Sequence, residues 1–365
     1  MTVTPPSDVP GSRLALRPSP LIILAVLASL YTLYFARAFL LPVTFAILLT
    51  FLLSPSVRWL ARLHIPAPLG AAIVVLALIG GVGLAAYELA GPVQTWTAKA
   101  PQSVATAERE LRKLLKPFER FTRTAQQVET AAGGGAAPQA QEVVVRGPTI
   151  VSRIFGSTQR FLAGLLEVVI LLYFLLAAGD LFLRKLIKVL PHLTDKLKAI
   201  RIARQTEASI STYLRTVALI NLVEGAVVAG AMQLLGMPNP LLWGALVTVL
   251  EFIPYLGAFT FLVVLFVAAL GTYQSLGPAL LPPAAFLLIN LLQANLFSPI
   301  LQGRRLALNP VAVFVGLAFW FWIWGVPGAF IGVPILAAFK ICCEHIESLA
   351  PIGEFLSARE ETPLP

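Results

Sequence analysis

The sequence contains little charge and very few cysteines and histidines. Only 12% of its 365 residues are Asp, Glu, Lys or Arg, while 58% are hydrophobic, and soluble domains carry roughly 25% charged residues. A water-soluble enzyme of this length could not bury so much apolar surface. A disordered or nucleic-acid-binding chain needs the opposite composition. The composition therefore predicts a membrane protein and argues against nucleic acid as a partner.

The few cysteines and histidines give no support to redox or metal chemistry. Cys342 and Cys343 are the only cysteines and are adjacent, which excludes a disulfide framework. The three histidines are far apart, without the spacing of zinc ligands. No phosphate-binding G-x-x-x-x-G-K-[ST] loop and no G-x-S-x-G nucleophile motif occurs. We therefore expect no cofactor, no metal and no enzymatic activity.

Positive charge is concentrated in one stretch of the chain. The net charge is +9, and 7 of the 27 basic residues lie between Arg184 and Arg204, where Asp195 is the only acid. Positive charge of this kind marks loops on the cytoplasmic side of a membrane, or a patch that meets anionic lipid. We expect the N- and C-termini to be cytoplasmic as well.

Charge-free runs of about 20 residues mark the membrane crossings. The runs at 21–36 and 38–57 are separated only by Arg37, which predicts two antiparallel helices joined by a tight turn. The complete predicted organisation is a disordered cytoplasmic tail (1–20), three transmembrane helices (21–91), an extracytoplasmic amphipathic insert with a Gly/Ala-rich linker (92–155), a fourth span (156–179), a basic cytoplasmic segment (180–216), a transport core (217–341) and a cytoplasmic tail (342–365).

The transport core contains two long charge-free segments, each broken in its middle. Residues 241–271 are interrupted by Ile-Pro-Tyr-Leu-Gly at 253–257, and residues 311–341 by Gly-Val-Pro-Gly at 325–328. Each arm of the first segment has about 13–15 residues, roughly 20 Å of helix, too short for a crossing but long enough to reach the midplane and return. The number of membrane crossings between the basic loops, which are expected inside, also requires that residues 241–271 begin and end on the same side of the membrane. Full spans kinked at proline are the alternative.

These segments predict an all-α polytopic membrane protein. It has six full transmembrane helices, two broken re-entrant hairpins and a small polar extracytoplasmic helical insert, or eight spans in conventional counting. Two broken helices that enter from opposite faces are typical of transporters with inverted repeats. Non-helical backbone at membrane depth is tolerated only where it is buried in protein or lines a wet cavity.

Two carboxyl groups within the core are candidates for transport or coupling, because an ionisable residue in a span is costly. Glu251 lies three residues before Pro254, next to the first break. It could bind a proton or cation or orient a polar solute, or it could only stabilise the hairpin. Glu224 lies in the fifth span, where its Ala226 and Gly230 predict close packing, and it could serve the path or a helix contact.

Amides on the sixth span form a second group of candidates. Asn290 and Gln293 share a helix face, and Asn295 lies to one side, before Pro299. Amides bind neutral polar solutes without adding charge, although hydrogen bonds between helices would explain them equally well. The candidates for the path or for coupling are therefore Glu251, Pro254, Tyr255, Gly257, Glu224, Asn290, Gln293, Asn295, Pro299, Gly325, Gly328 and Pro334.

Three motifs in the last third of the chain resemble those of the autoinducer-2 exporter (AI-2E) family, also called PerM-like permeases. They are Glu-Phe-Ile-Pro-Tyr-Leu-Gly at 251–257, Asn-Leu-Phe-Ser-Pro at 295–299 followed by Gly-Arg-Arg-Leu-Ala-Leu-Asn-Pro at 303–310, and Gly-Val-Pro-Gly-Ala-Phe-Ile-Gly-Val-Pro at 325–334. Their order and spacing match the family. The resemblance extends over nearly the whole chain in topology.

The resemblance implies a homo-oligomeric permease of the bacterial inner membrane. Members of the family are linked to export of the quorum-sensing furanone signal, and some to exchange of sodium or lithium for protons. Many relatives carry an acid six residues before the proline that corresponds to Pro299, and here that position is Gln293. Glu251 and Glu224 therefore remain as the candidates for coupling.

We expect a permease that exports a small polar metabolite or signalling molecule by alternating access, with residues 254–257 and 325–328 facing one central site. The partners are then a small polar solute, with or without proton or sodium coupling, and membrane lipids. A sodium(lithium)/proton antiporter of the same fold is the alternative. A third hypothesis is a non-transporting membrane scaffold that binds a partner through its extracytoplasmic insert.

The outer hairpin makes a topological prediction. Single cysteines introduced at Ser275 and at Asn239, in a background lacking Cys342 and Cys343, should both react with an impermeant thiol reagent added from outside. Labelling of either position only from inside would contradict the predicted topology.

Overall fold

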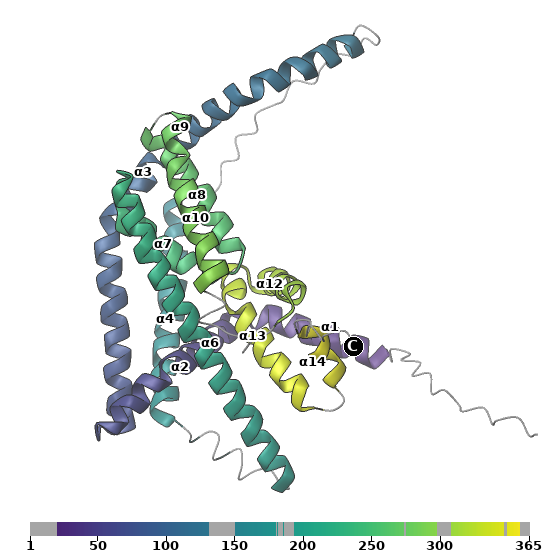
Figure 1. Ribbon diagram of the computed structural model, residues 1–365. Coiled ribbons are helices and arrows are strands. Elements are labelled where there is room, and N and C mark those ends of the chain that lie inside the picture. Colours follow the sequence, from purple (N-terminus) through teal and green to yellow (C-terminus); the bar gives the residue numbers. More distant parts are fainter. Residues whose placement is uncertain are drawn as a thin grey trace, which may run out of the picture.

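The computed structural model describes residues 20–130, 150–179, 181, 185, 193–273, 275–297, 308–346 and 349–357. Within these ranges the chain is almost entirely helical (Figure 1). The helices are α1 (Pro20–Phe35), α2 (Arg37–Arg62), α3 (Ala67–Thr130), α4 (Ile150–Ala178), α6 (Leu193–Leu234), α7 (Pro240–Leu250), α8 (Leu256–Tyr273), α9 (Leu276–Ala279), α10 (Leu281–Leu292), the π-helix η1 (Gln293–Phe297), α12 (Pro310–Trp324), α13 (Val326–His345) and α14 (Ala350–Leu356).

Seven helices among the described residues are long and apolar enough to cross a membrane. They are Arg37–Arg62, Ala67–Glu110, Phe161–Ala178, Ala199–Leu234, Leu256–Tyr273, Leu276–Leu296 and Val326–His345. The chain is thus a multi-pass α-helical membrane protein, as the composition predicts.

The predicted set of six full spans differs from these seven in three places. The helix α1 has only 16 residues and is not among the seven, whereas α8 and α13, predicted as short hairpin arms, have 18 and 20 residues. Each broken segment therefore pairs a short arm with a long one: α7 has 11 residues and α12 has 15. The prediction of equally short arms is wrong, because α8 begins at Leu256 within the predicted break and continues beyond residue 271, and α13 begins at Val326 within the second break and continues beyond residue 341.

The antiparallel pair predicted at the start of the chain is also wrong. Ala36, the single residue between α1 and α2, has φ −78° and ψ 5°, and helical hydrogen bonds run across it from Ala36 N to Thr32 O and from Leu40 N to Ala36 O. A reversal of the chain would need several non-helical residues. Instead α1 leads into α2 with a bend (Figure 1), and Arg37 lies over the ring of Tyr34.

Two predicted boundaries between spans and polar segments lie inside single helices. The third span and the first part of the predicted insert, up to Thr130, belong to one 64-residue helix, α3, and the later part of the basic segment belongs to α6, which has 42 residues. A change from apolar to polar side chains does not interrupt backbone hydrogen bonding, so it marks a membrane surface without ending a helix. The Gly/Ala-rich linker of the insert and the predicted tail over 1–19 lie outside the described residues.

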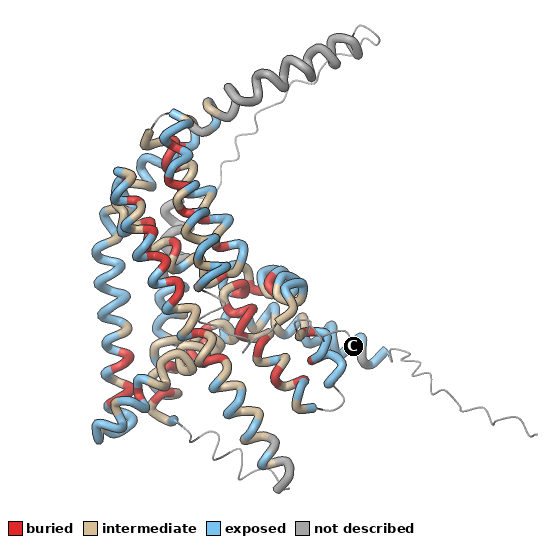
Figure 2. Tube along the Cα trace, in the orientation of Figure 1, coloured by how far each residue is buried: buried red, intermediate tan, exposed pale blue. Residues whose placement is uncertain are grey.

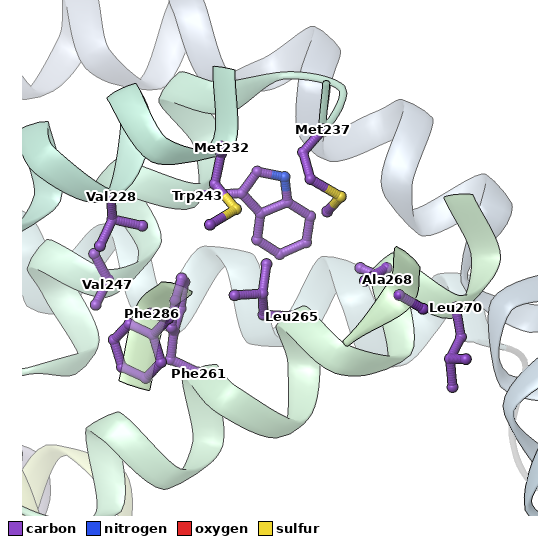
Figure 3. Packing of buried hydrophobic residues seen from close by; sticks show 12 residues of the cluster. Val228, Met232, Met237, Trp243, Val247, Phe261, Leu265, Ala268, Leu270 and Phe286 are labelled. Atoms are coloured by element: carbon purple, nitrogen blue, oxygen red, sulfur yellow. The ribbon is translucent and has the colours of Figure 1, made fainter. Parts of the chain in front are cut away.

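In the described part of the chain the helices pack around four groups of buried apolar side chains, of which two are the largest. One joins α2, α3 and α4, where Ala46, Ala71 and Leu172 are fully buried. The other joins α6, α7, α8 and α10 through the aromatic residues Trp243, Phe261 and Phe286 and both Met232 and Met237 (Figure 3). The rings of Phe261 and Phe286 meet edge to face with centroids 4.6 Å apart. In Figure 2 the buried positions follow α6, α7, α8 and α13, whereas the first half of α3 is largely exposed.

A close helix contact is formed by glycines on α6 and α7. A Cβ atom on Gly244 would collide with the carbonyl oxygen of Gly225 and lie 2.8 Å from Cβ of Ala229, and a Cβ atom on Gly225 would lie 2.6 Å from the carbonyl oxygen of Gly244. The sequence predicted this role for Ala226 and Gly230 instead. Both of these are exposed, and nothing lies within 4 Å of a Cβ atom built on Gly230. The small residues were identified correctly as a packing signal, but on the wrong face of the helix.

This difference gives a matched pair of variants. Gly244→Ala should lower the free energy of unfolding by about 1–3 kcal/mol, since the added methyl group overpacks a backbone contact. Gly230→Ala should not lower the free energy of unfolding, because its methyl group enters open space and alanine favours the helix. Denaturant or thermal unfolding of the purified protein in detergent measures both. Equal effects of the two variants would contradict the assigned contact.

Candidate functional site

The first break places Glu251 at the end of a short helix. α7 begins at Pro240 after Asn239, which has the left-handed conformation (φ 55°, ψ 59°), and it ends at Leu250 with Glu251 as the C-cap. Pro254 supplies no N–H, so it cannot continue the helix. Tyr255 has φ 64°, unusual for a residue with a Cβ atom. Gly257 follows, and a Cβ atom there would collide with the carbonyl oxygen of Leu250.

One side-chain amide joins two carboxyl groups from separate helices. Nδ2 of Asn290 on α10 donates to Oε1 of Glu224 on α6 at 3.1 Å and to Oε1 of Glu251 at 3.0 Å. A primary amide has two N–H donors, so each carboxyl group receives one. These three residues, called the carboxyl cluster below, are separated by up to 66 positions in the sequence.

Glu224 is the most buried member of the carboxyl cluster. It is only 3% exposed, and its second oxygen, Oε2, is buried without a hydrogen-bond partner among the described residues. Two adjacent carboxyl groups in an apolar surrounding are stable only when protons, cations or further donors compensate their charge. The cluster therefore offers an acceptor for a proton, a small cation or a hydroxyl or amino group of a solute.

Two polar residues that the sequence analysis missed support this arrangement. Oγ1 of Thr248 on α7 donates to the carbonyl oxygens of Gly244 at 2.8 Å and of Asn221 at 3.2 Å. With the orientation of its amide that satisfies both neighbours, Asn221 donates to Val217 O at 3.1 Å and accepts from Phe252 N at 3.2 Å. Asn221 lies three residues before Glu224 in an otherwise apolar stretch, and this spacing was a usable signal.

The second break lies against the first through apolar contacts. The rings of Phe252 and Phe330 are stacked with centroids 6.4 Å apart, and Ile253 packs with Leu317 and Ala329. The break itself is Gly325, with φ 67°, a conformation that favours glycine.

Gly328 and Pro334 lie beyond this break, and both are buried on α13. A Cβ atom on Gly328 would collide with the carbonyl oxygen of Trp320 on α12, so this glycine allows the two arms to approach closely.

In the described part of the chain, the remaining sequence candidates make no side-chain hydrogen bond to the carboxyl cluster. Gln293 is half-buried at the start of η1, and Asn295 is exposed and donates to Leu291 O of its own helix at 2.8 Å. Tyr255 is 60% exposed. Pro299 lies outside the described residues. Among the described residues, no group of three or more His, Cys, Asp or Glu side chains could hold a metal ion.

Comparison with known proteins identifies the family. The model of the AI-2E family transporter matches residues 21–348, nearly the whole chain. The chain belongs to the AI-2E transporter family. This membership confirms the resemblance of the three motifs, and it agrees with a protein that transports and is not an enzyme.

Bacterial relatives of this AI-2E family member are also named as transport proteins. AI-2 transport protein TqsA of Escherichia coli (strain K12) is 24% identical over 326 residues, 88% of this chain and 90% of its own. MT0215 of Mycobacterium tuberculosis (strain CDC 1551 / Oshkosh) is 29% identical over 332 residues, 87% and 86% of the two chains. A protein of Borreliella burgdorferi (strain ATCC 35210 / DSM 4680 / CIP 102532 / B31) is 29% identical over 213 residues, 58% of each chain. The last two names give transport as a provisional role and state no substrate.

The two asparagines of the sixth span provide a test of the cluster. Asn290→Ala should lower the free energy of unfolding by about 1–3 kcal/mol, because the buried carboxyl group of Glu224 and the partly buried one of Glu251 each lose a donor. Asn295→Ala should change it by less than about 0.5 kcal/mol, since that side chain is exposed and bonds only its own helix. Unfolding in detergent measures the difference, and a larger loss for Asn295→Ala would contradict the arrangement.

Proposed function

We propose that this AI-2E family member is a permease that moves a small polar solute out of the cell by alternating access, and that the carboxyl cluster is its coupling or solute site. The observation that carries the proposal is the bridge from Asn290 to Glu224 and Glu251. It places one buried and one partly buried carboxyl group beside a break in the helix, where backbone groups and side chains can both change partners. Discontinuous helices of this kind form solute sites in other transporters.

The substrate belongs to the proposal and rests on a relative. TqsA has a name that assigns it AI-2 transport, and we propose a small, hydroxylated signalling molecule of the same class as the exported solute. Carboxyl and amide oxygens accept hydrogen bonds from hydroxyl groups, which suits such a solute. The proposed location is a bacterial inner membrane.

The cytoplasmic position of both termini is likewise proposed, and it is supported by the grouping of basic residues at one end of the helices. Arg58 near the end of α2 pairs with Glu207 in the first half of α6, which joins these two helices on that side. Assembly as a homo-oligomer completes the proposal, and the many exposed apolar side chains of the single chain leave surface for lipid and for neighbouring copies.

Cation/proton exchange is the second candidate, and one observation favours it. Oε2 of Glu224 is buried without a partner among the described residues, and a proton or a sodium ion would satisfy it at little steric cost. An exchanger requires that the cluster alternate between these two ligands. A carrier of a neutral solute requires only that the cluster donate and accept hydrogen bonds.

The experiment is solute efflux from proteoliposomes loaded with AI-2, with and without an imposed pH gradient. In the coupled exporter, the gradient accelerates efflux and Glu251→Gln abolishes the acceleration, because the amide cannot carry a proton. Glu167→Gln is the matched control. It removes a carboxyl group from another candidate span, α4, and should leave the gradient dependence unchanged.

Two outcomes would overturn parts of this proposal. Efflux that is unchanged by the gradient and by Glu251→Gln would show that Glu251 has no coupling role and that the protein is a facilitator. If AI-2 does not move but a sodium gradient drives proton movement that Glu251→Gln abolishes, the protein is an exchanger and the assigned solute is wrong.

A further inference from the structure

Helix α3 packs against two different parts of the molecule. Near its start, Ala71 is buried among side chains of α2 and α4. Farther along, the ring of Trp96 meets that of Trp243 on α7 edge to face, with centroids 5.0 Å apart, and a Cβ atom on Gly271 of α8 would collide with Oγ of Ser103. This helix therefore connects the group formed by α2 and α4 with the group formed by α6, α7, α8 and α10.

Between these two contacts α3 has no packed face. Every residue from 79 to 88 is exposed, and in Figure 2 this part of the helix is pale blue almost without interruption. The stretch makes nearly three helical turns, so it presents all sides of the helix. In the described part of the chain, contacts with other helices therefore do not hold this stretch straight.

Three glycines lie within this exposed stretch, at positions 80, 81 and 83. Apart from the backbone of their own helix, no described atom lies within 4 Å of a Cβ atom built on any of them. They differ in this from Gly225 and Gly244, whose missing side chains allow a close helix contact. Glycine is less favourable than alanine inside a helix, because its backbone loses more freedom on folding. A close contact within the described chain does not explain these three glycines.

An unsupported helix with several glycines offers little resistance to bending. Sharp kinks in helices occur at few kinds of position, and neighbouring glycine or serine residues are one of them. Regions with few buried apolar contacts are also those that open most easily. Hinges between moving parts of a protein are a few residues that absorb changes in φ and ψ, and these residues are often small. The stretch 79–88 has these properties, and it lies between the two packed parts of α3.

We propose that Gly80, Gly81 and Gly83 form a hinge in α3. Bending at this hinge moves the later part of the helix (84–110), together with α7 and α8, relative to α2 and α4. The close contact of Ser103 with Gly271 resists sliding between α3 and α8, so these two helices move together. The hinge lies outside the carboxyl cluster, and the inference does not depend on which solute or ion the protein moves.

The test measures distances between pairs of spin labels by pulsed electron paramagnetic resonance, on the full-length protein in lipid nanodiscs. Labels are attached to cysteines introduced in a background lacking Cys342 and Cys343, and labelled protein is diluted with unlabelled protein so that only distances within one chain are measured. The first pair, Phe174→Cys on α4 and Val104→Cys on α3, lies on opposite sides of the hinge. The second pair, Val104→Cys and Leu280→Cys, lies on one side of it. All three positions are exposed. We expect a broad distribution of distances for the first pair and a narrow one for the second.

Alanine at the three glycines should remove the hinge. The triple variant Gly80→Ala/Gly81→Ala/Gly83→Ala should narrow the distribution of the first pair and raise the temperature of unfolding, because the methyl groups enter open space and alanine stiffens the helix. Gly164→Ala on α4 is the matched control. Its methyl group also enters open space, so it should stabilise the protein without narrowing the distribution. Gly81→Ala alone serves if the triple variant does not fold.

Three results would overturn the inference. A wild-type distribution for the first pair that is as narrow as that of the second would show that the two parts do not move relative to each other. A broad distribution that the triple variant leaves unchanged would place the hinge elsewhere. If the triple variant instead loses subunits, as measured by light scattering, while the distribution keeps its width, the glycines form a contact with a second copy of the chain.

Discussion

Backbone groups freed by a break in a helix must find partners within the protein when no water is available, and this constraint governs the core of the molecule. At the first break, the amide of Asn221 accepts from Phe252 N, and the carbonyl of Leu250 accepts from Ile253 N. At the second, Gly325 N donates to Phe321 O at 2.7 Å and Ala329 N donates to Gly325 O at 3.2 Å. Short-range hydrogen bonds therefore occur at both breaks, since Phe252 N also donates to Val249 O at 3.3 Å. At the first break, the side chain of Asn221 on α6 provides a second acceptor for the same N–H.

The contact between Asn221 and Phe252 N connects the carboxyl cluster to the break. One short stretch of α6 provides Asn221 for the backbone of the break, Glu224 for the cluster and Gly225 for the close contact with α7. Glu251 is the C-cap of α7 and therefore has a position fixed by the same contact. A displacement of the end of α7 relative to α6 would disturb the backbone partner of Phe252 and the partner of Glu251 together. The state of the cluster and the geometry of the break are consequently coupled through rigid, local contacts.

The sequence predicts those features whose cause is local. Pro254 and Gly325 interrupt helices through their own backbone requirements, so both breaks could be located from the printed residues. The sequence predicted helix ends at positions that lie inside α3 and α6, and these predictions are wrong. Backbone hydrogen bonding continues where the side chains change from apolar to polar. The contact of Gly225 with Gly244 and the bridge at Asn290 depend on how helices face one another. The contact of Asn295 could not be predicted either. The π-turn of η1 changes the register of the helix, and the side chain of Asn295 donates to the carbonyl oxygen of Leu291 in the same helix.

The two sides of the first break differ in the kind of contact they make, and this difference bears on how a permease of this form could move. Towards α6 and α10 the contacts are hydrogen bonds and glycine packing, which have little tolerance for displacement. Towards the second break they are the stacked rings of Phe252 and Phe330 and the packing of Ile253. In the described part of the chain the two breaks share no hydrogen bond. Sliding of α12 and α13 along this apolar surface would change dispersion contacts between the two breaks without breaking a hydrogen bond between them. A rearrangement that separates the two breaks therefore costs least at the Phe252–Phe330 contact, with α6, α7 and α10 moving as one unit and the carboxyl cluster intact.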